Sequence, residues 1–542
     1  MSFSAKNRSE YIQTLKTEQF DLVVIGGGIT GAGIALDAAT RGLKVALVEK
    51  QDFAFGTSSR STKLIHGGLR YLKQLEFGIV HEVGRERAIL YKNAPHIVIP
   101  EKMLLPIIKG GSLGKRSTSL GLYVYDKLAG VNRKERRFML DKSKTLAVEP
   151  LLNESILRGG GMYVEYRSDD ARLTIEVMKT AVSNGALCLN YIECTDFRLD
   201  EKNKISGIAV VDNLKNEDFI IQTKKVINAA GPWVDNLRKI DLSLKGKRLH
   251  LTKGVHIVIP HKRIPISHAT YFDVADGRMV FAIPRDNIVY LGTTDTNYKE
   301  DTNFPYAEKE DVQYILDAAN NMFPSLKLTM KDVISTWAGL RPLIHEDGKS
   351  PSDLSRKDEI FISESNLISI AGGKLTGFRK MAQRSVDVVC NQLKKEDGRL
   401  FQPCSTEFIQ LSGGNLEGKS IEEYARNLQT QYKDFDLDKV TALVKKYGSN
   451  TKEILEITES KTNNDLLLGE AIYSMNEEMT YNIADFFIRR TGRVYFERNS
   501  LEPIIEKSHQ FFKEQLYYDS ETALQFREDF NKEYEGVVQF KS

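Results

Sequence analysis

A run of glycines near the N-terminus carries the most specific chemistry in this sequence. The motif GxGxxG at residues 26–31 follows the apolar run 22–25, and Glu49 ends the next apolar run. In this arrangement the first glycine permits a tight turn, the second lets the backbone approach a pyrophosphate, and the third lets a helix pack on a strand. An acid about 20 residues further on accepts hydrogen bonds from ribose hydroxyls. We therefore predict a dinucleotide site. Glu49 argues against a 2′-phosphate, hence against NADP, but does not separate FAD from NAD.

The elements that must position this motif can be read on either side of it. The run 22–25 is apolar and mostly β-branched, which is typical of a strand buried on both faces. Residues 32–39 predict a helix with Gly42 as its C-cap, and residues 45–48 predict a second buried strand. The N-terminus of such a helix offers unpaired N–H groups to an anion. The spacing predicts a strand–turn–helix–strand unit of the expected size for dinucleotide binding.

Four longer stretches carry a family resemblance. They read GTSSRSTKLIHGGLRYL (56–72), VINAAGPWVD (226–235), STWAGLRPL (335–343) and ISIAGGKLTGFRKMA (368–382). With the glycine motif, they closely resemble FAD-dependent glycerol-3-phosphate dehydrogenases, which lie within the glycine-oxidase-like flavoproteins. The resemblance covers about residues 18–395 and implies FAD as the cofactor. The residues expected to contact FAD are Ile25, Gly26, Gly27, Gly28, Ile29, Thr30, Gly31, Glu49, Lys50, Thr57, Ser58, Ser59, Ser61, Thr62, Ala230, Gly231, Gly339, Gly372, Gly373, Leu375 and Thr376.

The substrate implied by this resemblance carries a phosphate dianion and a secondary alcohol. Arginine binds phosphate bidentately and keeps its charge at any working pH. The matched and neighbouring segments supply Arg70, Arg341, Arg356 and Lys374 as cations of the substrate site, with Tyr71 as a further hydrogen-bonding group. Arg341 is the strongest candidate because it lies in a mostly apolar segment, where a solvated surface charge is not expected.

Alcohol oxidation requires removal of the hydroxyl proton while a hydride passes to the flavin. Histidine has the unperturbed pKa nearest neutrality, and His66 and His256 are the two histidines in matched motifs, so each is a candidate base. Arginine stays protonated because its pKa exceeds ~12, so Arg341 is a poor general base and is assigned to binding and charge stabilisation. Lys374, between two glycines and a predicted helix, is expected to stabilise negative charge on the reduced flavin or the substrate.

The resemblance implies oxidation of sn-glycerol 3-phosphate to dihydroxyacetone phosphate, with electrons passing to a quinone (menaquinone or ubiquinone). The first alternative is a glycerol-3-phosphate oxidase of the same family, which uses oxygen. Those proteins carry a long polar insertion after WAGLRPL, whereas here only IHEDGKSPSDLSRKDE precedes the strand IFIS. The second is an amine or amino-acid oxidase on the same fold, against which the cationic cluster argues. The third is a non-catalytic flavoprotein that binds RNA.

The expected fold class is α/β, with three domains. A Rossmann-like FAD-binding domain of the glycine-oxidase/glutathione-reductase type is expected from residues 18–90, 168–240 and 355–398. A substrate-binding domain with an antiparallel sheet is expected from 91–167 and 241–354, where short alternating strands such as RMVFAIPR occur. Amphipathic runs after residue 398, such as IEEYARNLQTQY, predict a C-terminal helical domain over 399–542.

The composition argues against nucleic-acid binding, a membrane span and a metal site. The 542 residues include 76 basic and 73 acidic side chains, and the net charge of +3 is too balanced to indicate nucleic-acid binding. No window reaches the ~18 apolar residues of a membrane span. Four cysteines without ligand spacing predict reduced thiols, no metal site and a cytoplasmic protein. GGNLEGKS (413–420) has P-loop spacing, but no strand ending in a magnesium-binding acid follows it, so we interpret it as a turn before a helix.

A quinone is lipid-soluble, so a dehydrogenase that uses one must reach a bilayer. Residues 109–137 mix basic with apolar and aromatic side chains, which is the composition of a segment that binds an anionic membrane surface. We therefore expect peripheral contact with the inner face of the cell membrane, and keep a homodimer as an open alternative. The residues concerned are Lys109, Lys115, Arg116, Leu120, Leu122, Tyr123, Val124, Tyr125, Lys127, Leu128, Arg133, Lys134, Arg136 and Arg137.

Overall fold

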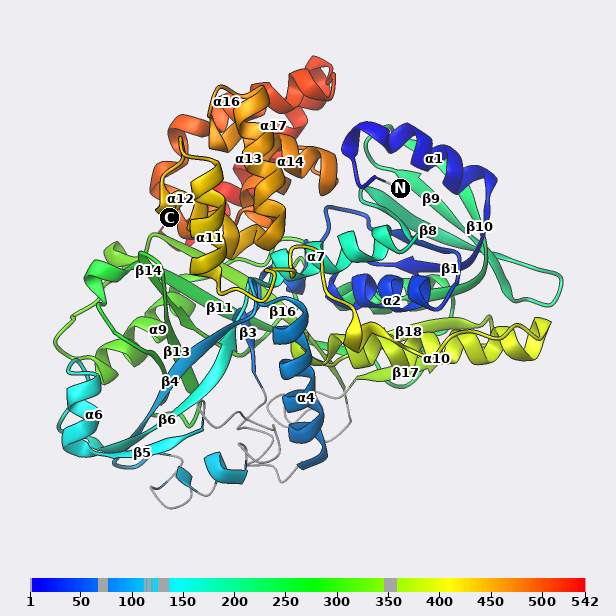
Figure 1. Ribbon diagram of the computed structural model, residues 1–542. Helices are drawn as coiled ribbons and strands as arrows, with labels where there is room; N and C mark the ends of the chain where they lie inside the picture. Colours follow the sequence, from blue (N-terminus) through cyan, green and yellow to red (C-terminus); the bar gives the residue numbers. More distant parts are fainter. Residues whose placement is uncertain are drawn as a thin grey trace.

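The described part of the chain folds into two β-sheets, their helices and a C-terminal group of helices (Figure 1). The computed structural model describes residues 2–66, 77–111, 114, 118–119, 121–124, 136–345 and 358–541. In Figure 1 the sheet with β1 and β10 lies to the right, the sheet with β4 and β6 to the lower left, and the C-terminal helices at the top. The helices before the C-terminal group are α1 (Arg8–Thr17), α2 (Ile29–Thr40), α4 (Phe77–Asn93), α6 (Lys142–Val148), α7 (Asp170–Ser183), α8 (Val234–Ile240), α9 (Lys309–Met322) and α10 (Phe378–Asp397).

The first sheet, called sheet A, contains the glycine motif. Its strand order is β17-β18-β10-β1-β2-β7, with β9 paired to β10 and β8 to β9. The strands from β18 to β7 run parallel, and Val23 of β1 lies between Val226 of β10 and Ala46 of β2. All three side chains are buried, as expected for a parallel sheet. The strands are β1 (Gln19–Ile25), β2 (Val45–Val48), β7 (Leu187–Leu189), β8 (Ile192–Leu199), β9 (Ile205–Asp212), β10 (Glu217–Asn228), β17 (Glu359–Ile362) and β18 (Leu367–Ala371).

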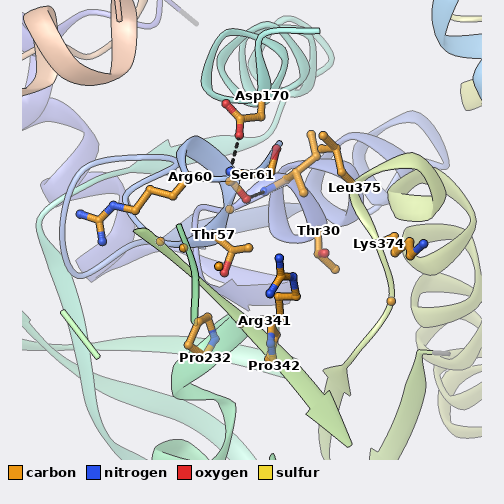
Figure 2. A pocket seen from close by; sticks show the side chains of 18 of the residues that line it. Thr30, Thr57, Arg60, Ser61, Asp170, Pro232, Arg341, Pro342, Lys374 and Leu375 are labelled. Carbon is orange, nitrogen blue, oxygen red and sulfur yellow. Dashed lines mark hydrogen bonds between the residues drawn. The ribbon is translucent and has the colours of Figure 1, made fainter. Parts of the chain in front are cut away.

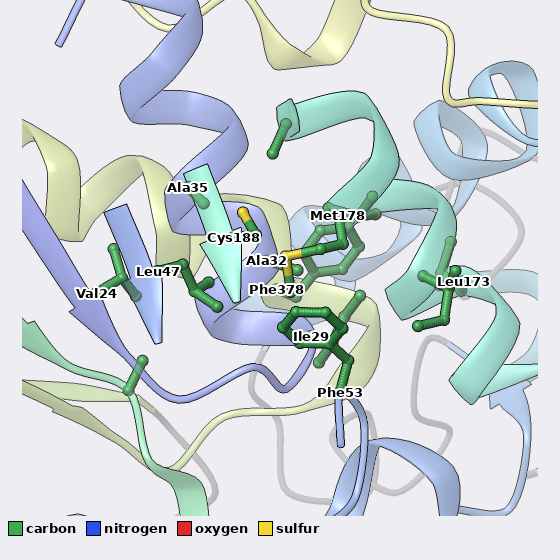
Figure 3. Packing of buried hydrophobic residues seen from close by; sticks show 14 of the residues in the cluster. Val24, Ile29, Ala32, Ala35, Leu47, Phe53, Leu173, Met178, Cys188 and Phe378 are labelled. Atoms are coloured by element: carbon green, nitrogen blue, oxygen red, sulfur yellow. The ribbon is translucent and has the colours of Figure 1, made fainter. Parts of the chain in front are cut away.

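Helix α2 packs on β1 and β2 and also contacts α7 and α10. Its small side chains, including Ala32 and Ala35, allow this close approach, and Met178 of α7 and Phe378 of α10 fill the space around it (Figure 3). A Cβ on Gly33 would lie 2.8 Å from the Phe378 ring, so the helix has no room for a larger residue there. This packing fixes the N-terminus of α2 at the carboxyl end of β1.

The second sheet, called sheet B, is mostly antiparallel. Its strand order is β15-β11-β14-β13-β12-β4-β6-β3, with β16 paired to β11 and β5 to β6. Among the described strands of this sheet, only β12 and β4 pair in parallel. Helix α9 contacts β11 and contributes Ile315 and Leu316 to a second apolar core. The strands are β3 (Leu64–Ile65), β4 (Ile99–Ile108), β5 (Phe138–Asp141), β6 (Leu157–Arg167), β11 (Leu249–Pro260), β12 (Ala269–Asp273), β13 (Met279–Arg285), β14 (Ile288–Gly292), β15 (Thr296–Asn297) and β16 (Ser335–Ile344).

Helices follow one another through the C-terminal part of the chain. The sequence GGNLEGKS forms the turn before α11, and Ser420 caps that helix in a capping box with Glu423, so the interpretation as a turn is confirmed. Within the described residues, no helix is long and apolar enough to cross a membrane. The elements are α11 (Ile421–Gln431), α12 (Leu437–Tyr447), α13 (Thr451–Lys461), α14 (Leu466–Glu477), the π-helix η11 (Asp485–Arg490), α15 (Arg493–Phe496), α16 (Glu502–Gln515) and α17 (Ser520–Gly536).

Candidate functional site

A cavity of about 940 Å³ lies where the carboxyl ends of β1, β10 and β18 meet sheet B. This volume suits a large organic ligand. Of the residues expected to contact FAD, all except Gly27, Gly31 and Ser59 line the cavity. The four residues expected to take part in catalysis also line it: His66, His256, Arg341 and Lys374. The structure therefore brings together segments that are more than 350 residues apart in the chain, from Ile25 to Thr376.

The three glycines of the motif have different surroundings. A Cβ on Gly26 (φ +115°) would lie 2.6 Å from the Ala229 carbonyl oxygen, and one on Gly31 would lie 1.8 Å from the Gly26 carbonyl oxygen. Both positions are closed by protein atoms. Among the described residues, a Cβ on Gly28 would meet only the Ser58 side chain, with its hydroxyl at 3.1 Å, and Gly28 lines the cavity. Gly28 is thus the position where bare backbone faces the ligand space at the N-terminus of α2.

The Glu49 carboxylate lines the cavity beside the glycine turn. Its Oε2 accepts a hydrogen bond from the Gly27 N–H (2.7 Å) and its Oε1 from the Gln51 N–H (2.9 Å). Burial raises the pKa of this carboxyl above its usual range, while the two backbone N–H groups oppose that effect. Each carboxylate oxygen has a second lone pair that is available to ribose hydroxyls. The backbone bonds hold the carboxylate in place before any ligand binds.

The loop after β2 joins the two sheets beside the cavity. The Thr57 hydroxyl donates to the Leu340 carbonyl (2.6 Å), and the Trp337 Nε1–H donates to the Ser61 carbonyl (3.0 Å). The Ser61 N–H donates to the Asp170 carboxylate (2.9 Å), as Figure 2 shows. A Cβ on Gly339 would lie 2.3 Å from the carbonyl oxygen of residue 60, so only glycine permits this approach of β16 to the loop.

Arg341 projects from β16 into the cavity, on the side that carries Thr57 and Thr30 (Figure 2). Its guanidinium donates to the Asp295 carboxylate (3.1 Å), the Thr293 hydroxyl (3.0 Å) and the Thr294 carbonyl (3.3 Å). We call these acceptors the Arg341 cradle. The side chain remains 25% exposed, so the cradle orients the guanidinium without burying it. A fixed planar donor of this kind suits a phosphate or carboxylate.

Both candidate histidines line the cavity, but their surroundings differ. His256 is buried, stacks on Trp337 with ring centroids 4.8 Å apart, and its Nε2 lies 3.0 Å from the Thr62 hydroxyl. Burial, with the nearby charges of Arg341 and Lys63, holds the pKa of His256 well below its usual range. His256 is therefore neutral near pH 7. His66 is half-buried and lies edge-on against Phe281.

The remaining predicted substrate residues divide into two groups. Lys374 lines the cavity and comes immediately before the short 3₁₀ turn that leads into α10. Gly372 and Gly373, both at φ +78°, turn the chain from β18 towards it. Arg70, Tyr71 and Arg356 lie outside the described residues.

The prediction from sequence missed several groups in the cavity. Thr293, Thr294 and Asp295 form the Arg341 cradle, and Trp233 and Asp170 also line the cavity. The cradle follows directly on the apolar strand β14 in the sequence NIVYLGTTD. Polar residues at the end of a buried strand are a signal that could have marked it, but only the pairing of β11 with β14 and β16 brings these residues to Arg341.

Comparison with known proteins defines the class. Residues 21–378 match the family model described as FAD dependent oxidoreductase, and residues 404–523 match the C-terminal domain of alpha-glycerophosphate oxidase. The L-alpha-glycerophosphate oxidase of Mycoplasma pneumoniae shares the fold, with a TM-score of 0.57 and 18% identity over 71% of this chain and 97% of that one. Fold and cavity are those of an FAD-dependent oxidoreductase, which confirms the predicted fold class and cofactor.

Closer relatives define the family. The aerobic glycerol-3-phosphate dehydrogenase of Staphylococcus aureus (strain USA300) is 52% identical over 92% of this chain and 91% of its own. The glycerol-3-phosphate dehydrogenase of Bacillus halodurans, solved with FAD, superposes with a TM-score of 0.85 and 45% identity over 99% of both chains. The chain belongs to the glycerol-3-phosphate dehydrogenase family, so the predicted resemblance is confirmed.

Proposed function

We propose that this chain oxidises sn-glycerol 3-phosphate to dihydroxyacetone phosphate and passes the electrons to a quinone. The observation that supports this most directly is the position of Arg341. Its oriented guanidinium faces the same cavity as the backbone of Gly28 at the N-terminus of α2. An anion-binding group and a dinucleotide-binding turn in one cavity are what a flavoenzyme acting on a phosphorylated alcohol requires.

The residues of the cavity fit FAD. The backbone at residues 26–30 and the Thr57–Ser61 loop would hold the pyrophosphate, and Glu49 would hold the ribose. Residues 230–231 and 372–376, at the ends of β10 and β18, would lie against the flavin. FAD, when bound, supplies the hydride acceptor. We further propose that sheet A with its helices forms the FAD-binding domain and sheet B the substrate-binding domain. The ranges expected from the sequence follow this division except at β3, a strand of sheet B that lies within the range 18–90.

Arg341 is proposed to bind the phosphate of the substrate, together with Lys374 and with Arg70, Tyr71 and Arg356 from outside the described residues. Charge-assisted hydrogen bonds of this kind contribute about 1.5–3 kcal/mol each. A phosphate dianion beside Arg341 would also offset the positive charge that lowers the pKa of His256. Substrate binding would therefore make His256 a better proton acceptor, with His66 as the alternative base.

The decisive experiment is reduction of the bound flavin by substrate without oxygen. Addition of glycerol 3-phosphate to the purified protein should bleach the visible absorbance of the flavin, and subsequent addition of a soluble quinone should restore it. Arg341→Lys retains the charge but loses the planar fork, so it should need a much higher concentration of substrate for the same bleaching. An unreduced flavin in the wild-type protein would refute the proposal.

The same flavin-reduction assay distinguishes the dehydrogenase from the two alternative oxidases. Rapid recovery of colour with oxygen, without a quinone, would indicate an oxidase instead. Reduction by an amino acid, but not by glycerol 3-phosphate, would indicate an amine or amino-acid oxidase.

The same assay identifies the base when His66→Asn and His256→Asn are compared across pH. The variant that retains its flavin but is reduced slowly by glycerol 3-phosphate lacks the base.

We also propose that the protein associates reversibly with the inner face of the cell membrane, as a quinone-linked enzyme must. The predicted basic segment at residues 109–137 lies mostly outside the described residues. Within it, Leu122 is buried, so that residue does not belong to a membrane-facing surface. Tyr123 is 45% exposed and lies under the Arg137 guanidinium. Sedimentation with anionic vesicles at low and high salt, with Arg136 and Arg137 changed to Gln, tests this segment.

A further inference from the structure

The C-terminal helices hold one end of the loop that follows β2. Asp52 in this loop is 1% exposed and forms ion pairs with two consecutive arginines of the π-helix η11. Arg489 Nε lies 2.6 Å from Asp52 Oδ2, and the Arg490 guanidinium donates to both carboxylate oxygens, at 2.7 and 2.8 Å. Burial alone would raise the pKa of Asp52, but these guanidiniums hold it below its usual range. The carboxylate is therefore charged and fully paired.

A second contact holds the other end of the same loop. Glu533 of α17 accepts from Arg489 (3.1 Å) and lies 3.5 Å from the guanidinium of Arg60. Both guanidiniums also lie over the ring of Phe55, at 5.4 Å from its centroid for Arg489 and 5.0 Å for Arg60. One buried network thus spans residues 52–60 of the loop and two elements of the C-terminal helical part. Within this network, Asp52 and Arg489 are 437 residues apart in the chain.

The opposite side of this loop forms the proposed FAD site. The Ala54 N–H donates to the Gly27 carbonyl (3.0 Å), and a Cβ on Gly27 would lie 2.6 Å from the Phe53 ring. Thr57, Ser58 and residues 60–62 line the cavity. Among the described residues, none beyond Met381 lines the cavity. The C-terminal helices therefore touch the loop but not the ligand space.

We infer that the C-terminal helical part sets the affinity for FAD by holding the loop of residues 52–61, with Arg489, Arg490 and Glu533 as positioning residues. A loop fixed before binding loses less conformational freedom when FAD binds, and this strengthens binding without a new contact. The inference rests on the proposed placement of FAD in this cavity. It gives the C-terminal helices a role in cofactor retention.

The test compares two ion-paired arginines of the C-terminal helical part, with side chains 3% exposed at Arg489 and 16% exposed at Arg493. Arg489→Gln removes a pair with the loop, whereas Arg493→Gln removes a pair with Glu470 that lies wholly among the C-terminal helices (2.5 Å). FAD affinity is measured on the full-length apoprotein by quenching of flavin fluorescence, and thermal unfolding is recorded for each variant. We expect the dissociation constant for FAD to rise at least about tenfold in Arg489→Gln and to stay within about twofold of wild type in Arg493→Gln.

Further variants keep the inference open to refutation. Arg489→Lys retains the charge and should restore part of the affinity. If Arg489→Gln does not fold, Glu533→Gln removes the bridge between Arg489 and Arg60 at a less buried position and should also weaken FAD binding. Equal weakening by the Arg489 and Arg493 changes, or no weakening by Glu533→Gln, would overturn the inference while leaving the proposed function intact. A wild-type protein that binds no FAD would overturn both.

Discussion

A substitution at Gly254 should move Arg341 without changing any charge. Gly254 lies on β11 beside the Arg341 cradle, and a Cβ there would lie 2.3 Å from Arg341 Nη2, 2.7 Å from Cζ and 2.7 Å from the Thr293 hydroxyl. Ordinary contacts of a Cβ begin at about 3.4 Å. In Gly254→Ala the guanidinium must therefore shift by roughly 1 Å, a displacement that breaks the alignment a bidentate bond needs.

The size of the effect follows from the bonds that would be lost. A charge-assisted hydrogen bond to phosphate contributes about 1.5–3 kcal/mol, and each 1.4 kcal/mol changes an equilibrium about tenfold. Loss of one such bond should raise KM for glycerol 3-phosphate about 10- to 100-fold. Since phosphate binding is present in both the ground state and the transition state, kcat should fall less than KM rises.

The assay is steady-state reduction of a soluble quinone by glycerol 3-phosphate, with FAD content and thermal unfolding measured on the same preparations. Gly78→Ala is the matched control, because Gly78 is an exposed residue of α4 where a Cβ would meet nothing within 4 Å. An unchanged KM in Gly254→Ala, with FAD bound and unfolding unaltered, would refute the assignment of Arg341 to phosphate binding.

Two further predictions concern the cofactor and acid stability. Gly28→Val should give a folded but colourless protein, because its side chain would enter the cavity, whereas Gly31→Val should fail to fold since a Cβ there meets the Gly26 carbonyl at 1.8 Å; absorbance and circular dichroism distinguish these results. Burial alone would raise the pKa of Glu470, but Arg493 and Lys446 lower it from 4.5 to about 2. Its stabilisation is therefore present above about pH 4.5 and lost as pH falls towards 2, about 3 kcal/mol in all. We expect the free energy of unfolding of Glu470→Gln, measured by chemical denaturation, to depend less on pH between about pH 4.5 and 2 than that of the wild type. An equal pH dependence in both proteins would contradict a lowered pKa at Glu470.

The local structural units and the family were predictable from the amino-acid sequence. The helix predicted at 32–39 lies within α2, and the strand predicted at 45–48 is β2, because apolar periodicity and turn residues act over a few neighbours. Only the cap differs slightly: Arg41 is the C-cap and Gly42 follows it at φ +88°. Most of the residues that the motifs predicted to contact the cofactor do line the cavity, because a contact to a dinucleotide needs a particular backbone at a particular turn.

The distant groups that contact those motifs could not be predicted in this way. Asp295 and Thr293 meet Arg341 because β14 and β16 pair with β11 on either side, and no spacing in the sequence indicates that pairing. Leu122 lies among charged residues in the sequence, yet packing buries it. Asp52 meets Arg489 across 437 residues. Such contacts depend on how whole sheets and helices pack, and burial turns ordinary surface residue types into fixed, paired charges.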